Sequence, residues 1–302
     1  MSETAKKKRS IAQLILVIFA FLVYFVLLLR RLLKGKNIAV LNPKGTIALQ
    51  QRNLIFYTVA ILLVVAVPTF TALYFIAWRY RESNNQAKRA DRTRHRKTLA
   101  VCIWLIPFTT MVVLAVHMAS ATHKLAPHNA IASGGKPLTI QVISLRWKWL
   151  FLYPEQGIAT VNFVQIPVNT PVEFDLTADE TPMSSFWIPN LGGQLYSMTS
   201  HENRLNLMAD TPGDYPGRNT EINGEGFAGM KFTARASSMD DFNNWAQSVK
   251  QSSQVLDAAA YQKILIPSQD NPNVFFSNYE TNLYSKVIDK YEGPTTGTGS
   301  GT

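Results

Sequence analysis

The sequence predicts a membrane-anchored α+β protein, with a transmembrane helical hairpin followed by a β-sandwich outside the membrane. Two long apolar runs without charge and a series of short alternating segments after residue 136 support this fold class. Charge is also divided unevenly, since residues 1–118 carry a net charge of +15 and residues 119–302 carry −5. The positive half of the chain is also its apolar half, whereas a nucleic-acid-binding protein carries its positive charge on the surface of a folded domain. We therefore expect no nucleic acid partner.

Residues 37–122 are expected to contain the hairpin, with helices over about 54–78 and 99–118. The first of these runs is 25 residues long without a charge, and about 20 apolar residues suffice to span a bilayer. The loop between them, residues 79–97, holds eight Lys and Arg residues and is placed in the cytoplasm by the positive-inside rule. The chain after about residue 119 then lies on the outer side of the membrane.

Residues 1–36 form an N-terminal apolar segment that has two interpretations. Its apolar core, residues 11–29, follows a short basic run, which is how both signal peptides and membrane helices begin. The core is 19 residues long and ends in further basic residues instead of a small-residue cleavage site. We favour a retained helix, and a cleaved signal peptide stays open as the alternative.

Residues 136–236 consist of short alternating segments separated by Gly- and Pro-rich turns. Residues 158–167 are expected to form one strand, and the Pro- and Gly-rich segment 211–217 is expected to be a turn. Segments spaced by about 8–12 residues are typical of an antiparallel sandwich or barrel. Residues 237–291 change to a helical pattern that opens with Ser and acidic residues, a helix start signal. We expect this small C-terminal extension to be helical and the low-complexity tail, residues 292–302, to be disordered.

One segment is unusually rich in aromatic residues, "LRWKWLFLYPEQG", which begins at Leu145. Trp147 and Trp149 are two residues apart, so strand alternation places both on one face. Aromatic residues favour strands, and the Pro and Gly that follow end them. The segment is therefore interpreted first as a core strand, with a functional aromatic patch as the alternative.

The hairpin, this aromatic strand and several later motifs resemble subunit II of the haem–copper terminal oxidases. The motifs follow in the family's order over roughly residues 40–290: "LNPKGTIALQQRNLI", "WKWLFLYPEQGIATVN", "SSFWIPNLGGQLY", "TPGDYPG" and "GFAGMKF". With the C-terminal extension they look most similar to the quinol-oxidising branch, the cytochrome bo-type ubiquinol oxidases. The resemblance implies a cupredoxin-like Greek-key sandwich for the outer domain.

The resemblance also implies where a copper centre would lie. In the branch that oxidises cytochrome c, the sandwich holds a two-copper centre with cysteine, histidine and methionine ligands. Aligned on the Trp-Ile-Pro and Gly-Met-Lys anchors, the corresponding positions here are Ser184, Asn219, Glu221, Asn223, Phe227 and Met230. Both cysteines and both histidines are replaced, and copper requires such soft and imidazole ligands. We therefore expect no metal and no cofactor on this chain.

Trp147 and Trp149 take a structural interpretation from the same comparison. In copper-bearing relatives a tryptophan of this motif helps electrons enter from cytochrome c. Without copper no acceptor is present, so we assign both residues to strand packing and subunit contact.

A further departure from the family pattern lies in the second hairpin helix. Relatives carry a glutamate seven residues before the helix proline, at the mouth of a proton path into subunit I. Counting back from Pro107 gives Ala100, so that carboxylate is lost here. The nearest carboxylates on that side are Glu82 and Asp91. Proton entry by this route is therefore in doubt.

The remaining histidines and the cysteine give no site. His117 lies near a helix end, where we do not expect a haem ligand. His123, His128 and His95 are expected to be solvated, and the pair His123 and His128 lacks a third ligand nearby. The single cysteine, Cys102, lies within an apolar run, so no disulfide forms within the chain.

Taken with the resemblance, these observations predict subunit II of a proton-translocating ubiquinol oxidase in a bacterial inner membrane, with its large domain in the periplasm. The resemblance implies that haems, copper and ubiquinol are bound by subunit I, and that subunits III and IV and membrane lipid are further partners. This chain is then a structural and assembly subunit without catalytic residues. Two alternatives stay open: a cytochrome c oxidase subunit II, and a stand-alone membrane-anchored extracytoplasmic binding protein.

Overall fold

The computed structural model describes residues 38–82, 84, 97–131 and 135–291, together with positions 24, 27, 28 and 31. These residues belong to two compact units, 1–42 and 43–302, and each is described by itself. In the first unit a short 3-10 helix, η1, spans Ala39–Leu41. Most of the predicted N-terminal helix and of the basic loop, and the whole tail 292–302, lie outside the described residues. The predictions for those segments therefore stay predictions.

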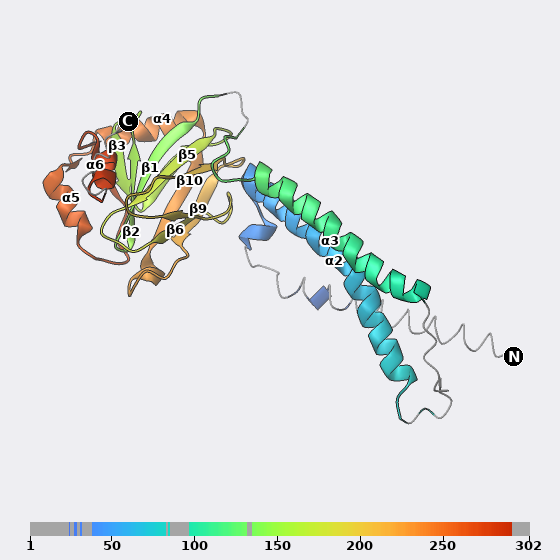
Figure 1. Ribbon diagram of the computed structural model, residues 1–302. Coiled ribbons are helices and arrows are strands. Elements are labelled where there is room, and N and C mark those ends of the chain that lie inside the picture. The colour runs from blue at the N-terminus through green and yellow to red at the C-terminus, as the bar shows by residue number, and fades with distance from the viewer. Residues whose placement is uncertain are drawn as a thin grey trace, which may run out of the picture. The chain divides into compact units, whose positions relative to one another are not determined.

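The second unit begins with the predicted hairpin, which consists of α2 (Thr46–Arg79) and α3 (Lys97–Lys124) packed side by side (Figure 1). Both helices are long and apolar enough to cross a membrane. Each runs past its predicted limit at the end nearest the sandwich, because helical hydrogen bonding continues there through polar residues that interrupt the apolar run. Their apolar side chains are widely exposed, with Phe70 at 70% and Trp104 at 79%. Apolar surface of this extent requires lipid or other chains to cover it.

The β-sandwich follows as two packed sheets (Figure 1). The first sheet has the spatial order β12 (Val274–Phe276), β3 (Ile158–Val161), β2 (Lys148–Tyr153), β1 (Leu138–Leu145), β5 (Val172–Ala178) and β8 (Asn203–Leu207). The second has the order β4 (Phe163–Pro167), β10 (Lys231–Ser237), β9 (Gly213–Asn219), β6 (Ser184–Trp187) and β7 (Leu195–Ser197). A small separate pair joins β11 (Val255–Leu256) to β13 (Asn278–Tyr279). The predicted fold class, a helical hairpin followed by a β-sandwich and a small helical extension, is confirmed.

Three details of the strands differ from the predictions. The pairs β1–β5 and β4–β10 are parallel, so the sandwich is not wholly antiparallel. The segment 158–167, expected as one strand, is two strands in opposite sheets, because Asn162 has a left-handed φ of 57° between them. β9 contains a segment read as a turn from its Pro and Gly residues, yet Pro216 is accommodated opposite Thr233 of β10.

The aromatic-rich segment forms β2, a strand of the first sheet, and this sheet is buried on both faces. Trp149 and Phe151 of β2 point into the core between the two sheets, where they contact the stacked pair Phe186 and Phe232. The alternating Leu150 and Leu152 point to the other face, into a second core. Every residue of β2 is consequently buried, which explains why large apolar residues follow one another in its sequence without alternating polar ones.

The C-terminal extension covers that second face with two of its three helices, and its first helix packs on the core between the sheets. Its helices are α4 (Met239–Lys250), α5 (Ala258–Leu265) and α6 (Leu283–Asp289), as the helical pattern predicted. Ser238 and Asp257 cap α4 and α5 by accepting hydrogen bonds from the amides of Asp241 and Ala260. The second core is built from α5, α6 and the first sheet.

Backbone hydrogen bonds join the start of α2 to the sandwich. The amide of Lys44 donates to the carbonyl of Asn190 at 2.8 Å, and the amide of Ala48 donates to that of Leu191 at 3.1 Å. The hydroxyl of Thr46 donates to the carboxylate of Asp210 at 2.8 Å. The polar end of the hairpin is thus attached directly to the outer domain.

Candidate functional site

The positions assigned by alignment to copper ligands come together where β6 and β9 meet. Ser184 begins β6, Asn219 ends β9, and the loop after β9 passes through the short helix η2 (Phe227–Gly229) to Met230. Ser184 and Met230 are fully buried, while Asn219 and Asn223 are 3% and 7% exposed. We call the following six residues the loop cluster: Ser184, Asn219, Glu221, Asn223, Phe227 and Met230.

Asn219 organises the beginning of the loop through its side-chain amide. Its Oδ1 accepts hydrogen bonds from the backbone amides of Ser185, at 2.7 Å, and Glu221, at 3.0 Å. Its Nδ2 donates to the carbonyl of Glu221 at 2.8 Å. One side chain therefore satisfies three backbone groups that would otherwise be unpaired in a largely buried place.

Asn223 closes the other half of the cluster. Its Nδ2 donates to Ser184 Oγ at 3.0 Å and to Met230 Sδ at 3.4 Å. The amide thus joins the start of β6 to the start of β10 and uses the sulfur atom as an acceptor. Asn223 Oδ1 has no hydrogen-bond partner within the described part of the chain.

The donor set of the loop cluster does not fit a pair of copper ions. Copper sites of this kind need thiolates and imidazoles, whereas amides, a hydroxyl and a phenyl ring stand at those four positions. Met230 carries the one soft ligand atom, and that sulfur accepts a hydrogen bond from Asn223. The structure brings together the residues that the alignment selected. Their descent from copper positions, and the predicted lack of a metal, stay predictions.

Trp147 does not share a strand face with Trp149, so that prediction is wrong. Trp147 lies in the tight turn between β1 and β2 and has a left-handed φ of 63°. Its indole packs on Gly224 and Gly226 of the loop that follows β9. A side-chain carbon at Gly226 would overlap the indole ring. Trp147 is partly buried against the same core as Trp149, but it packs from a turn, where it supports the loop that follows β9.

Trp149 is fully buried between the two sheets. Its ring meets Phe186 edge to face, with the centroids 5.3 Å apart. Its backbone amide donates to Asn162 Oδ1 at 2.9 Å, which fixes the residue that divides β3 from β4. These contacts give Trp149 a place in the core, and its structural role stays a prediction.

The hairpin residues singled out from the sequence lie apart from the loop cluster. Ala100 is exposed on α3 and lines an apolar surface with Trp104 and Phe108. His117 lies against Tyr57 of α2, with ring centroids 4.2 Å apart. His123 and His128 are both exposed. The alternative carboxylate Asp91 and the loop residue His95 lie outside the described residues.

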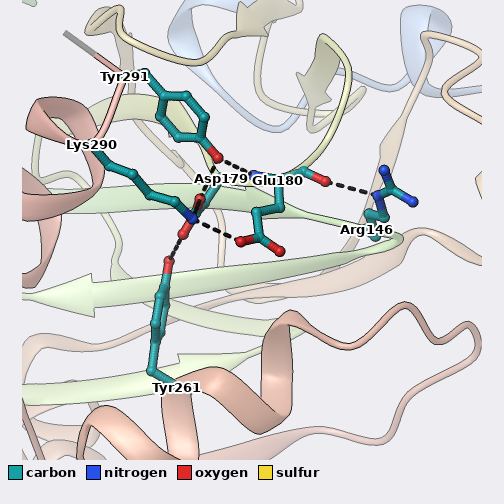
Figure 2. Close-up of polar contacts among 6 residues, drawn as sticks. All are labelled: Arg146, Asp179, Glu180, Tyr261, Lys290 and Tyr291. Atoms are coloured by element: carbon teal, nitrogen blue, oxygen red, sulfur yellow. Dashed lines mark hydrogen bonds and ion pairs between the residues drawn. The ribbon is translucent and has the colours of Figure 1, made fainter. Parts of the chain in front are cut away.

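A second polar cluster, which the sequence analysis missed, surrounds Asp179 (Figure 2). Asp179 follows β5, is 1% exposed, and accepts hydrogen bonds from Tyr261 at 2.6 Å and Tyr291 at 2.7 Å. Lys290 bridges Asp179, at 2.9 Å, and Glu180, at 2.8 Å. Arg146 donates from Nε to the carbonyl of Glu180 at 2.8 Å. Residues 110 positions apart therefore fasten the C-terminal extension to the sandwich.

Burial and hydrogen bonding change the protonation behaviour of this second cluster. Burial, together with the hydrogen bond to Asp179, raises the pKa of Tyr261 well above its ordinary value. Burial alone would lower the pKa of Lys290, but its hydrogen bonds to Glu180 and Asp179 raise it above the ordinary value. Both groups hold their protons at neutral pH, so the cluster keeps a neutral phenol and a charged ammonium around Asp179.

Lys148 makes a second attachment between the sandwich and the C-terminal extension. Its ammonium donates to the carbonyls of Ile264, at 2.9 Å, and Ile266, at 2.8 Å, and so binds the end of α5. Desolvation by burial lowers the pKa of Lys148. The lysine of the aromatic-rich segment is thus used inside the protein and not at its surface.

Comparison with known proteins identifies the family. A family model described as "COX Aromatic Rich Motif" matches residues 250–295, which include α5 and α6. Cytochrome bo(3) ubiquinol oxidase subunit 2 of Pseudomonas putida is 41% identical over 266 residues, which cover 88% of this chain and 84% of the relative. The chain belongs to the ubiquinol oxidase subunit 2 family. Ubiquinol oxidase subunit 2 of Acetobacter aceti is 40% identical over 262 residues, covering 86% of this chain and 85% of that protein.

Among solved structures, the chain is similar to the periplasmic domain of subunit II of cytochrome oxidase from Bradyrhizobium japonicum. It aligns with a TM-score of 0.36 and 21% identity, over 38% of this chain and 96% of that domain.

The Asp179 cluster could not have been found by the motif search. Asp179 and Glu180 follow a buried strand, and Lys290 and Tyr291 close the predicted helical extension, so each pair was visible in the sequence. No local pattern joins the two pairs, because their contact depends on how α6 docks on the first sheet. The aromatic-rich match to residues 250–295 is the one signal that singles out this region.

Proposed function

We propose that this chain is the second subunit of a proton-translocating ubiquinol oxidase and that it carries no redox centre of its own. The relatives named above support the first part, since they are ubiquinol oxidase subunits and match most of the chain. The second part rests on one observation, the hydrogen bonds from Asn223 to Ser184 and Met230. In these bonds, side chains at the positions expected for copper ligands bond to one another, and the sulfur of Met230 is used as a hydrogen-bond acceptor.

The wide apolar surface of α2 and α3 supports a position in the bacterial inner membrane beside oxidase subunit I. In this proposal the sandwich stands in the periplasm, and haems, copper and ubiquinol are bound by subunit I. Subunits III and IV are further partners. The chain contributes no catalytic residue, and its role is structural: it holds the outer domain on the catalytic subunit and supports assembly.

The proposal is tested by purification of the complex. The chain is tagged at its C-terminus, extracted gently from native membranes, and assayed for haem and for oxygen uptake with ubiquinol or with reduced cytochrome c. We expect haem in the preparation and oxygen uptake with ubiquinol alone. The uptake should be abolished by haem-site inhibitors such as cyanide.

The other outcomes distinguish the alternatives. Oxygen uptake with reduced cytochrome c would contradict the proposal and would require an entry centre for electrons on this chain. A haem-free preparation with neither activity would instead favour the stand-alone binding protein.

A further inference from the structure

Two cavities adjoin each other at the end of the hairpin that is attached to the sandwich. Each has a volume of about 380 Å³. They share Gln50 of α2 and Lys124 and Leu125 at the end of α3. One cavity extends from these residues toward the sandwich, and we call it the head cavity. The other extends between α2 and α3, away from the sandwich, and we call it the groove.

The head cavity is lined by a mixture of polar and apolar residues and by one cation. Amide side chains come from α2, from the segment after α3 and from the sandwich, with Gln51, Asn129 and Gln194 as examples. Lys124 supplies the positive charge. Within residues 38–82, 84 and 97–131, the one carboxylate is Glu82, at the opposite end of the hairpin. Asp210 of the sandwich reaches this end but accepts a hydrogen bond from Thr46. An anionic group is therefore the complementary occupant.

The groove has a different composition. Its walls include Leu54, Tyr57 and Ala121, and its polar atoms belong to a few side chains such as Asn53 and Ser120. His117 precedes Lys124 by seven residues, so the groove extends about 10 Å along the helix below the lysine. Apolar walls directly below a polar, cationic opening match a ligand with a charged head and a hydrocarbon tail.

The position of Lys124 argues in the same direction. Cations are disfavoured on the outer side of a membrane hairpin by the positive-inside rule, whose basic residues here lie in the loop 79–97. Lys124 is exposed, and its long side chain reaches the opening shared by the two cavities. A cation beside a polar cavity at this end of the hairpin can pair with the phosphate of an anionic lipid head group, since a charge-assisted hydrogen bond to phosphate is stronger than one between neutral groups.

We propose that the head cavity and the groove form one binding site for an anionic phospholipid. The phosphate is bound by the ammonium of Lys124 and the amide of Gln50, and one acyl chain lies along Leu54, Tyr57 and Ala121. The bound lipid thus occupies both the head cavity and the groove. The proposal depends on insertion of the hairpin in a membrane and is independent of which electron donor the complex uses.

The test uses the purified complex and measures bound lipid by native mass spectrometry after titration with phosphatidylglycerol or phosphatidylcholine. We expect the wild-type complex to prefer phosphatidylglycerol, and Lys124→Gln to weaken its binding roughly tenfold. Lys44→Gln is the matched control, because Lys44 is a cation just before α2, at the same end of the hairpin, and lines neither cavity. Lys44→Gln should retain wild-type affinity.

Three outcomes would overturn the proposal. Equal losses in Lys124→Gln and Lys44→Gln would mean that general charge, and not this site, attracts lipid. Displacement of the lipid by millimolar inorganic phosphate would mean that the site takes a free anion. A photo-crosslinker at position 120, in place of Ser120, should label lipid in the complex, and labelling of a protein subunit alone would mean that a partner helix fills the groove.

Discussion

Asn223 donates a hydrogen bond from its side-chain amide to the hydroxyl of Ser184 at 3.0 Å, across 39 residues of sequence. Both residues are buried, and both stand at positions that the sequence motifs predict to correspond to copper ligands of the cytochrome c-oxidising branch. A polar pair of this kind makes the loop cluster a self-contained hydrogen-bonded structure. The consequences of these contacts can be measured.

The loop cluster should be sensitive to loss of Asn219. Asn219→Ala removes three side-chain hydrogen bonds and leaves the buried amide of Ser185 unpaired. We predict a loss of about 2–4 kcal/mol in the free energy of unfolding of the sandwich. Urea unfolding of the purified protein measures this loss, with Asn243→Ala, an exposed position on α4, as the control. Equal stability of the two variants would contradict the assigned role of Asn219.

Restoring the ligands should restore a copper site. A variant with Ser184→His, Asn219→Cys, Asn223→Cys and Phe227→His places two thiolates and two imidazoles beside Met230. We predict that it binds copper and gains the intense visible absorption of copper–thiolate bonds. A matched variant that keeps Asn223 should bind copper weakly or not at all. Failure of the folded fourfold variant to take up copper would show that the alignment misassigned these positions.

Gly226 should tolerate no side chain, because its α-carbon faces the indole of Trp147. Gly226→Ala is predicted to lower the stability of the sandwich by about 1–3 kcal/mol, through displacement of the loop or the tryptophan. Gly135→Ala is the control, since a side-chain carbon at Gly135 meets no atom within 4 Å. Thermal unfolding followed by tryptophan fluorescence distinguishes the two. An unchanged Gly226→Ala variant would contradict the packing described.

The C-terminal extension should loosen when Asp179 loses its charge. Asp179→Asn weakens the bonds from Lys290 and the two tyrosines, and hydrogen bonds to a charged group contribute about 1.5–3 kcal/mol each. We predict that amide hydrogen exchange in α5 and α6 becomes at least about tenfold faster. Asp289→Asn, an exposed change at the end of α6, should leave exchange unaltered. Similar exchange in both variants would exclude Asp179 as the anchor.

Alkaline pH should release the same segment. The folded protein raises the pKa of Tyr261, chiefly by burial, and also that of Lys290, so both bind their protons more tightly than in the unfolded chain. The stability that they contribute is complete below about pH 10, the ordinary value for both side chains, and is lost as pH rises above it. Limited proteolysis at pH 8 and at about pH 11 measures this release. Tyr261→Phe, which cannot ionise, should make the loss less steep, and equal protection at both pH values would contradict the prediction.

The sequence predicted the hairpin and the C-terminal helices because their signals are local. Apolar runs define α2 and α3, and the capping residues Ser238 and Asp257 define the starts of α4 and α5. Both membrane helices were predicted too short at the end nearest the sandwich, because hydropathy detects the extent of the apolar run and not the last helical hydrogen bond. The loop cluster was located through the family motifs, which carry information that composition and periodicity lack.

The parts that failed depend on single backbone angles and on tertiary contact. A left-handed Asn162 divides one predicted strand between two sheets, and a left-handed Trp147 moves that residue out of its strand. Alternation rules assume extended backbone at every position, so they cannot detect either residue. The bond from Lys290 to Asp179 requires the docked position of α6, which no local pattern specifies.

The copper content of the purified complex tests most directly whether this chain lacks a redox centre. Copper is measured by mass spectrometry of the metal and divided by the amount of this chain. We predict one copper atom per chain, contributed by subunit I. Three copper atoms per chain, with the electron paramagnetic resonance of a shared copper pair, would show a two-copper centre in the sandwich and would contradict the central proposal.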